Sequence, residues 1–134
     1  MTARSKARKR ALDLLFASEL RSESPVDALE RATDAGEGPT NEYTAALVRG
    51  VVENQRSIDA LLAESAQGWT LERMPAVDRN VLRLGVFEIL YVDDVPDAVA
   101  VSEAVTLVRD LSTDESPTFV NGVLGAILRN KPAV

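Results

Sequence analysis

The chain has 134 residues and a formal net charge of −6, with 46% hydrophobic and 27% charged residues and neither cysteine nor histidine. This length and composition indicate one globular domain, or two small subdomains that share a core. The lack of cysteine and histidine excludes disulfides, thiolate or imidazole metal sites and His-dependent catalytic triads, so we expect no metal and no cofactor. No run of about 18 apolar residues and no secretory signal occur, which predicts a cytoplasmic protein without a membrane span.

The start of the chain carries a dense group of cations, which we call the basic arm (residues 4–10). Five of these seven residues are basic: Arg4, Lys6, Arg8, Lys9 and Arg10. In a chain that is acidic overall, this asymmetry is typical of a protein that holds a polyanion at one end. The alternative is a solubilising, partly frayed terminus, and charge alone does not decide between the two.

Apolar residues at helical spacing predict a first helix over residues 3–21, which includes the basic arm. On the helical wheel Lys9 lies close to Phe16, two turns further along. Cations beside an exposed ring indicate binding of single-stranded nucleic acid, with the ring stacking on a base. The alternative is that Phe16 is simply part of the core. A cap at Ser24 followed by proline predicts a short second helix to about residue 35.

The remainder of the chain also shows helical periodicity. A long third helix is expected from an N-cap at Thr40 to about Gly68, with Gly50 as a weak point, followed by a turn at 70–74. Further helices are predicted over residues 77–91 and 98–111 and from Ser116 onward.

No segment alternates with period two for long enough to predict a strand. The fold class is therefore all-α, with about six or seven helices in two packed three-helix bundles. We expect a single domain, 1–134, with an N-terminal subdomain over residues 1–67 and a C-terminal subdomain over residues 68–134.

Charged residues on the predicted helix 77–91 allow two interpretations. Arg79 and Arg83 lie one turn apart and extend a cationic surface, but the neighbouring Asp78 is equally consistent with a local ion pair. Glu88 falls on the apolar stripe of the same helix, where a carboxylate is usually paired. A structural role for Glu88 is favoured over a catalytic one, because no second positioned carboxylate or base accompanies it.

The start of the last predicted helix is acidic. Asp114 and Glu115 complement the helix dipole there, or they limit the approach of RNA or receive a basic partner. Gly122 and Gly125 lie within the same helix, where glycine has low propensity, so we expect them to admit a close neighbouring backbone.

Two blocks of the chain closely resemble the family of the transcription antitermination factor NusB. The first is Val-Asp-Arg-Asn-Val-Leu-Arg-Leu-Gly-Val-Phe-Glu-Ile-Leu at residues 77–90. The second runs from Val95 and Pro96 through residues 99–105 to Phe-Val-Asn-Gly-Val-Leu at residues 119–124, a specific signature. The cationic start that leads into residues 11–16 also resembles the first helix of the family, so the resemblance covers nearly the full chain.

The resemblance implies a small helical protein that binds single-stranded boxA RNA of ribosomal RNA transcripts together with the ribosomal protein NusE. The pair helps the transcribing RNA polymerase complex to read through terminators. Carried over by position, the implied RNA-binding residues are Arg4, Lys6, Arg8, Lys9, Arg10, Phe16 and Arg79. The implied partner-binding residues are Asp78, Glu115 and Phe119. Phe16 stands where relatives often have tyrosine, so the stacking face is kept and a hydroxyl is lost.

The leading hypothesis is therefore a non-enzymatic antitermination factor that binds RNA. The alternative is a protein-interaction helical module without specific RNA binding, whose apolar helix faces dock a partner or a second copy. The sequence leaves open whether the chain is a monomer or a homodimer. An enzyme that relies on Glu88 is a third hypothesis, disfavoured by the lack of a second catalytic group.

Overall fold

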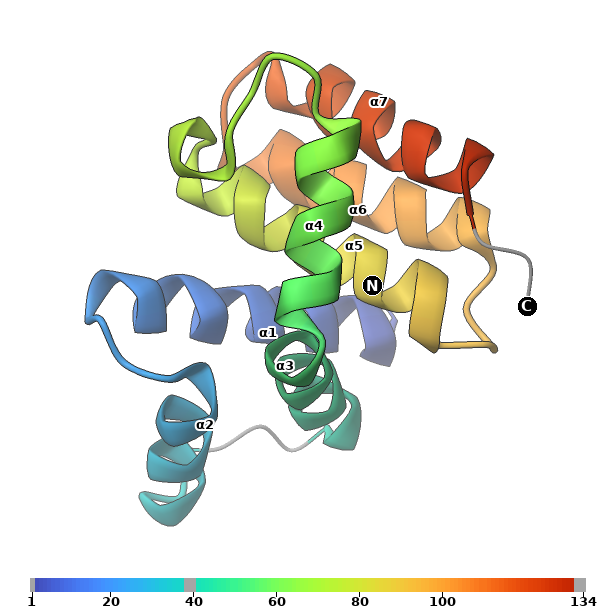
Figure 1. The fold of residues 1–134 in the computed structure, drawn as a ribbon. Helices are drawn as coiled ribbons and strands as arrows, with labels where there is room; N and C mark the ends of the chain where they lie inside the picture. Colours follow the sequence, from blue (N-terminus) through green and yellow to red (C-terminus); the bar gives the residue numbers. More distant parts are fainter. Residues whose placement is uncertain (1, 38–40, 132–134) are drawn as a thin grey trace. The chain divides into compact units, whose positions relative to one another are not determined.

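A computed structural model describes residues 2–37 and 41–131 (Figure 1). Within these ranges the chain forms seven α-helices and one short 3-10 helix, with no strand, which confirms the all-α prediction. In chain order the elements are α1 (Ala3–Leu20), α2 (Pro25–Asp34), α3 (Glu42–Glu53), α4 (Gln55–Ser65), η1 (Leu71–Arg73), α5 (Ala76–Tyr91), α6 (Asp97–Leu111) and α7 (Ser116–Arg129).

The long third helix predicted from the sequence is interrupted after Glu53. Asn54 ends α3, because its backbone N–H and its side-chain Nδ2 both donate to the carbonyl of Gly50, at 3.1 and 2.8 Å. Gly50 itself is buried inside α3 and does not break it. The break therefore comes from an asparagine that satisfies the helix end with its own side chain, rather than from the glycine. The predicted cap Thr40 lies outside the described residues, and the N-cap of α3 is Asn41.

The chain forms two compact units, Met1–Asn54 and Gln55–Val134. The predicted division lay later, between residues 67 and 68, because the sequence pattern gave no sign of the helix end at Asn54. In the first unit α1 packs on α2 and α3, and α2 also packs on α3. The core of this unit is aliphatic and includes Ala11, Leu12, Leu15, Leu29, Leu47, Val48 and Val51.

The second unit is built around α5, which contacts α4, α6 and α7. The helices α6 and α7 form the most extensive pair, and α4 packs on both α5 and α7. Most of α5 is buried, as its nearly continuous apolar sequence predicts. Its core partners include Ile58, Leu62, Ala104, Val108, Val120 and Leu124.

The link between α1 and α2 is fixed by an exposed ion pair. The Arg31 guanidinium donates to both carboxylate oxygens of Glu23, at 2.6 and 2.8 Å. These hydrogen bonds lower the pKa of Glu23 and raise the pKa of Arg31 from their ordinary values. Because both groups lie at the surface, we expect this pair to set the geometry of the link more than the stability of the unit.

Three glycines of the second unit differ in their surroundings. A Cβ atom at Gly85 would lie 3.0 Å from Leu124 Cδ1, so glycine at this point of α5 permits the close packing of α7. A Cβ atom at Gly122 would meet nothing within 4 Å, and one at Gly125 only the Arg129 side chain at 3.5 Å. The expectation that Gly122 and Gly125 admit a neighbouring backbone of this chain is therefore wrong.

Alanine at Gly122 is expected to raise the free energy of unfolding by about 1 kcal/mol, because glycine in a helix interior costs about that much relative to alanine. Denaturant unfolding followed by circular dichroism measures the change. Gly85→Ala is the matched control in the same unit, and it should lower stability because its Cβ would press on the buried Leu124. Equal effects of the two changes would contradict this account of the glycines.

Candidate nucleic-acid interface

The basic arm forms the first two turns of α1 and is fully helical. Thr2 caps the helix, since its Oγ1 accepts from the Ser5 N–H at 3.0 Å. This cap favours an ordered helix start over the frayed terminus that the charge pattern left open. The arm residues are therefore carried on a rigid element.

The five cations of the arm differ in how they are held. Lys6 is exposed to solvent. Lys9 pairs with Asp13, one turn further along α1, at 3.2 Å. Arg10 donates from Nη2 to the Glu37 carbonyl at 3.2 Å. These surface contacts are weak enough to exchange for a phosphate.

The two remaining arginines of the arm pack against an aromatic ring. The guanidinium carbon of Arg4 lies 4.3 Å from the centroid of Tyr43, and that of Arg8 lies 5.9 Å from it. Arg8 is only 4% exposed. Arg8 was predicted to bind RNA with the other four cations, but its long side chain is buried and is used in packing.

Phe16 lies on α1, two turns beyond Lys9, and is half-buried. Neither of the two interpretations of the sequence, an exposed ring or a core ring, describes it fully. The accessible part of the ring leaves room for contact with a base, and the assignment of Phe16 to RNA binding stays a prediction.

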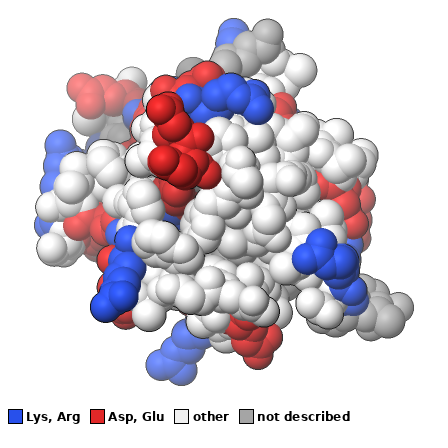
Figure 2. All heavy atoms as spheres, turned by 90° about the horizontal axis from the view of Figure 1, so that it is seen from above, with Lys and Arg blue, Asp and Glu red and all other residues white. Residues whose placement is uncertain are grey.

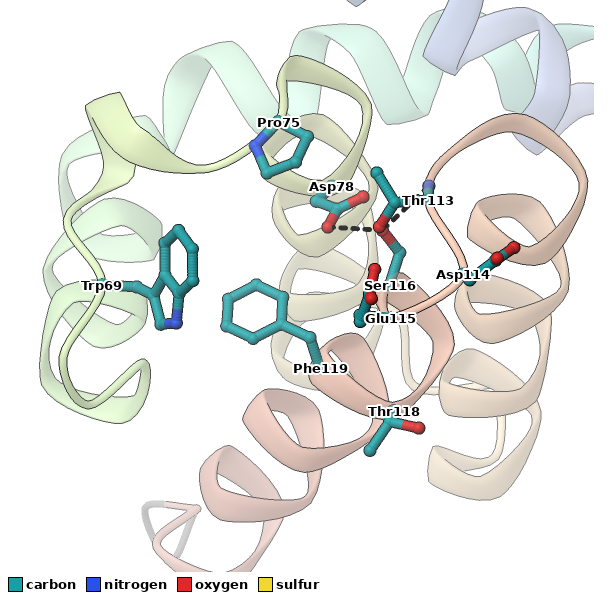
Figure 3. Close-up of a pocket in the computed structure, with 9 residues that line it drawn as sticks. All are labelled: Trp69, Pro75, Asp78, Thr113, Asp114, Glu115, Ser116, Thr118 and Phe119. Atoms are coloured by element: carbon teal, nitrogen blue, oxygen red, sulfur yellow. Dashed lines mark hydrogen bonds between the residues drawn. The ribbon is translucent and has the colours of Figure 1, made fainter.

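The second unit contains a groove of about 720 Å³ near the start of α7. Figure 3 shows the residues that line it: Trp69, Pro75, Asp78, Thr113, Asp114, Glu115, Ser116, Thr118 and Phe119. The rings of Trp69 and Phe119 face each other edge-on, with centroids 5.8 Å apart. Trp69 is 49% exposed, although large apolar side chains are usually covered. Trp69 is exposed and Phe119 is half-buried, so this aromatic pair can stack on a flat ring while the neighbouring carboxylates accept hydrogen bonds from the edge of that ring.

One wall of the groove is held by the buried carboxylate of Asp78. It accepts hydrogen bonds from Ser112 Oγ at 2.6 Å and from Ser116 Oγ at 2.8 Å (Figure 3 draws the second). The Thr113 N–H donates to Ser116 Oγ at 3.2 Å, which completes the turn between α6 and α7. Asp78 is 2% exposed, and its carboxylate accepts from two serines where the sequence suggested a local ion pair with an arginine. Its assignment to the partner surface stays a prediction.

The two arginines of α5 also have structural partners. Arg79 donates from Nη1 to the carbonyls of Leu71, at 2.9 Å, and Met74, at 3.2 Å, which fixes η1 beside the groove. Arg83 forms a bidentate ion pair with Asp59 of α4, in which Nε donates to Oδ1 at 2.9 Å and Nη2 donates to Oδ2 at 3.0 Å. Arg79 is half-buried, so its predicted contact with RNA competes with its role in holding η1.

Two residues of these sites were missed by sequence reasoning. Trp69 was not assigned to a binding site, although a tryptophan in a polar turn is a signal for an exposed binding residue. Tyr43 was not singled out, because its contact with the arm depends on the packing of α3 against α1.

One face of the molecule has a broad uncharged area. Figure 2, which is seen from above relative to Figure 1, shows this area with charged side chains around part of it. In the second unit, a shallow groove of about 610 Å³ between α6 and α7 is lined by apolar and small residues that include Val101, Val105, Gly122 and Gly125, and also by Arg109 and Arg129. Across the described ranges, no helix is long and apolar enough to cross a membrane.

The sequence and the fold both match known proteins. The NusB family profile matches residues 5–129. The transcription antitermination protein NusB of Nocardioides sp. is 72% identical over 134 residues, which cover 100% of this chain and 99% of the relative. The protein of the same name from Arthrobacter sp. is 55% identical and covers 100% of this chain and 98% of the relative.

Solved structures give the same result. T. maritima NusB superposes with a TM-score of 0.85 at 34% identity, covering 96% of this chain and 92% of that one. A chain in the crystal structure of antitermination factors NusB and NusE in complex with dsRNA superposes with a TM-score of 0.82 at 28% identity. The match covers 95% of this chain and 96% of that one. These matches place the protein among the transcription antitermination factors. The chain belongs to the NusB family, as its two sequence blocks indicate.

Proposed function

We propose that this chain binds boxA RNA of ribosomal RNA transcripts together with the ribosomal protein NusE, and that the complex helps RNA polymerase to read through terminators. The helical basic arm carries the proposal, because a capped helix displays four cations at the start of an otherwise acidic chain. The solved complex of NusB and NusE with dsRNA supports it. The protein acts in the cytoplasm and by binding alone, without catalysis.

The arm supplies affinity through the RNA backbone. Arg4, Lys6, Lys9 and Arg10 neutralise phosphates and release condensed counterions, so affinity falls with salt by a slope of about −0.7 per phosphate contacted. Four such contacts give a slope of about −3 in a plot of log affinity against log salt concentration. This term is insensitive to base sequence.

The groove of the second unit supplies contacts to bases. Trp69 and Phe119 offer a stacking surface, and Glu115 at its rim accepts from an amino group of a base or from a basic partner. The exposed carboxylates of Asp114 and Glu115 repel phosphates, so an unpaired base enters the groove more favourably than the backbone does. Phe119 thereby contributes to RNA binding, whereas Glu115 stays a proposed contact of NusE.

Removal of the exposed ring tests the groove. Trp69→Ala is expected to weaken binding of boxA RNA about tenfold, because stacking of one base on an aromatic side chain contributes about 1–3 kcal/mol. Fluorescence anisotropy with labelled RNA measures this, and Trp69→Phe should keep most of the affinity. Tyr91→Ala is the matched control, because Tyr91 is 45% exposed but lies outside the groove. Unchanged RNA affinity with a loss of NusE binding would assign the groove to the protein partner.

A helical module that binds only protein is the second candidate function. The broad uncharged area favours it, since such a surface suits a protein partner or a second copy (Figure 2). Binding assays with boxA RNA and with scrambled RNA of equal length distinguish the two functions, because a module that binds only protein would show no preference for boxA RNA. Sedimentation velocity of the protein alone shows whether a homodimer forms.

A further inference from the structure

Tyr43 connects the start of α3 to the basic arm. Its ring lies under the Arg4 guanidinium, 4.3 Å from ring centroid to guanidinium carbon. A cation within about 6 Å of a tyrosine face is attracted by the ring quadrupole, and Arg4 lies well inside this range. Arg8, at 5.9 Å, lies at the outer limit of this attraction.

Two hydrogen bonds fix the backbone around Tyr43 to the arm. Asn41 donates from Nδ2 to the Ala3 carbonyl at 3.1 Å, and Thr44 donates from Oγ1 to the Ala7 carbonyl at 3.2 Å. Asn41 also caps α3, since its Oδ1 accepts from the Tyr43 N–H at 2.8 Å. The ring therefore projects from a segment that is tied to the same two turns of α1 that carry the cations.

We propose that Tyr43 is a positioning residue for RNA binding, which holds the Arg4 guanidinium in a fixed place at the start of α1. An arginine side chain that no neighbour restricts loses rotamer entropy when a phosphate immobilises it. Contact with Tyr43 already restricts the Arg4 side chain in the free protein, so less side-chain entropy is lost when RNA binds. A guanidinium presents its N–H donors in the plane of the group, in a geometry that matches phosphate oxygens. The inference rests on the proposed RNA binding of the arm.

A double-mutant cycle tests the proposal. Tyr43→Leu is expected to weaken boxA RNA binding about three- to fivefold, and Tyr43→Phe, which keeps the ring, to retain nearly all of the affinity. In the Arg4→Ala background, Tyr43→Leu should cause little further loss, because the group that it positions is gone. In the Lys6→Ala background the same change should cause its full three- to fivefold loss. Circular dichroism of each variant checks that α1 and α3 remain folded.

The possible results separate this inference from the function on which it rests. Equal losses from Tyr43→Leu in the Arg4→Ala and Lys6→Ala backgrounds would assign Tyr43 a purely structural role and overturn the proposal. Full affinity of Tyr43→Leu would overturn it as well, with RNA binding by the arm left intact. A wild-type chain that does not bind boxA RNA would overturn the proposed function and this inference together.

Discussion

Replacement of Asp78 by alanine is expected to lower the free energy of unfolding by about 3 kcal/mol, because a buried hydrogen bond to a charged group contributes about 1.5–3 kcal/mol. The carboxylate accepts from both Ser112 and Ser116, and it is 2% exposed. Its removal leaves Ser116, which is also buried, without its charged acceptor. Urea unfolding followed by circular dichroism measures the loss.

Two variants control this experiment. Asp78→Asn keeps one carbonyl acceptor of the same size and should cost less, about 1 kcal/mol. Asp114→Ala removes an exposed acid from the same turn and should change stability by less than about 0.5 kcal/mol. If Asp78→Ala and Asp114→Ala lowered the free energy of unfolding by similar amounts, the negative charge of the turn, and not the hydrogen bonds to the two serines, would determine stability.

Replacement of Lys6, Lys9 and Arg10 together by alanine is expected to weaken boxA RNA binding roughly fiftyfold at physiological salt, since each phosphate contact contributes about fourfold through counterion release. The slope of log affinity against log salt concentration should also become shallower by about 2, at roughly 0.7 for each lost contact. Arg8 is kept in this variant, because it is buried and its loss would disturb packing. Binding curves over a range of salt concentrations measure both quantities.

The matched control removes three exposed arginines from the second unit. Arg56, Arg109 and Arg129 change to alanine together, so net charge changes by the same amount as in the arm variant. We expect RNA affinity to fall only slightly. If the control lost as much affinity as the arm variant, total charge rather than the arm would account for RNA binding. A slope that stayed the same in the arm variant would show that these cations do not contact phosphates.

Local sequence signals were sufficient to predict most of the fold. The predicted helix over residues 77–91 differs from α5 by one residue at its start, because an uninterrupted apolar pattern and Pro75 mark it. The end of α3 could not be predicted in the same way. Asparagine is common inside and outside helices, and only its hydrogen bonds to Gly50 show that Asn54 terminates one.

The candidate sites were predicted only in part, because contacts far apart in the sequence decide how each side chain is used. Charge density alone located the arm, but the stacking of Arg4 on Tyr43 depends on how α3 packs against α1. Asp78 was assigned to the partner surface only by its position in the resemblance to the NusB family. Its hydrogen bonds join residues 34 and 38 positions apart, and no local pattern indicates them.

The buried position of Asp78 affects how genetic results on this protein should be interpreted. A strain that carries Asp78→Ala would contain less of the protein, because a chain that unfolds more often is degraded more often in the cell. Such a strain would lose antitermination through the lower amount of folded protein, whether or not Asp78 takes part in binding. Protein abundance measured by immunoblot therefore has to accompany any phenotype assigned to this corner. Changes at the exposed Trp69 should impair function at a normal protein level.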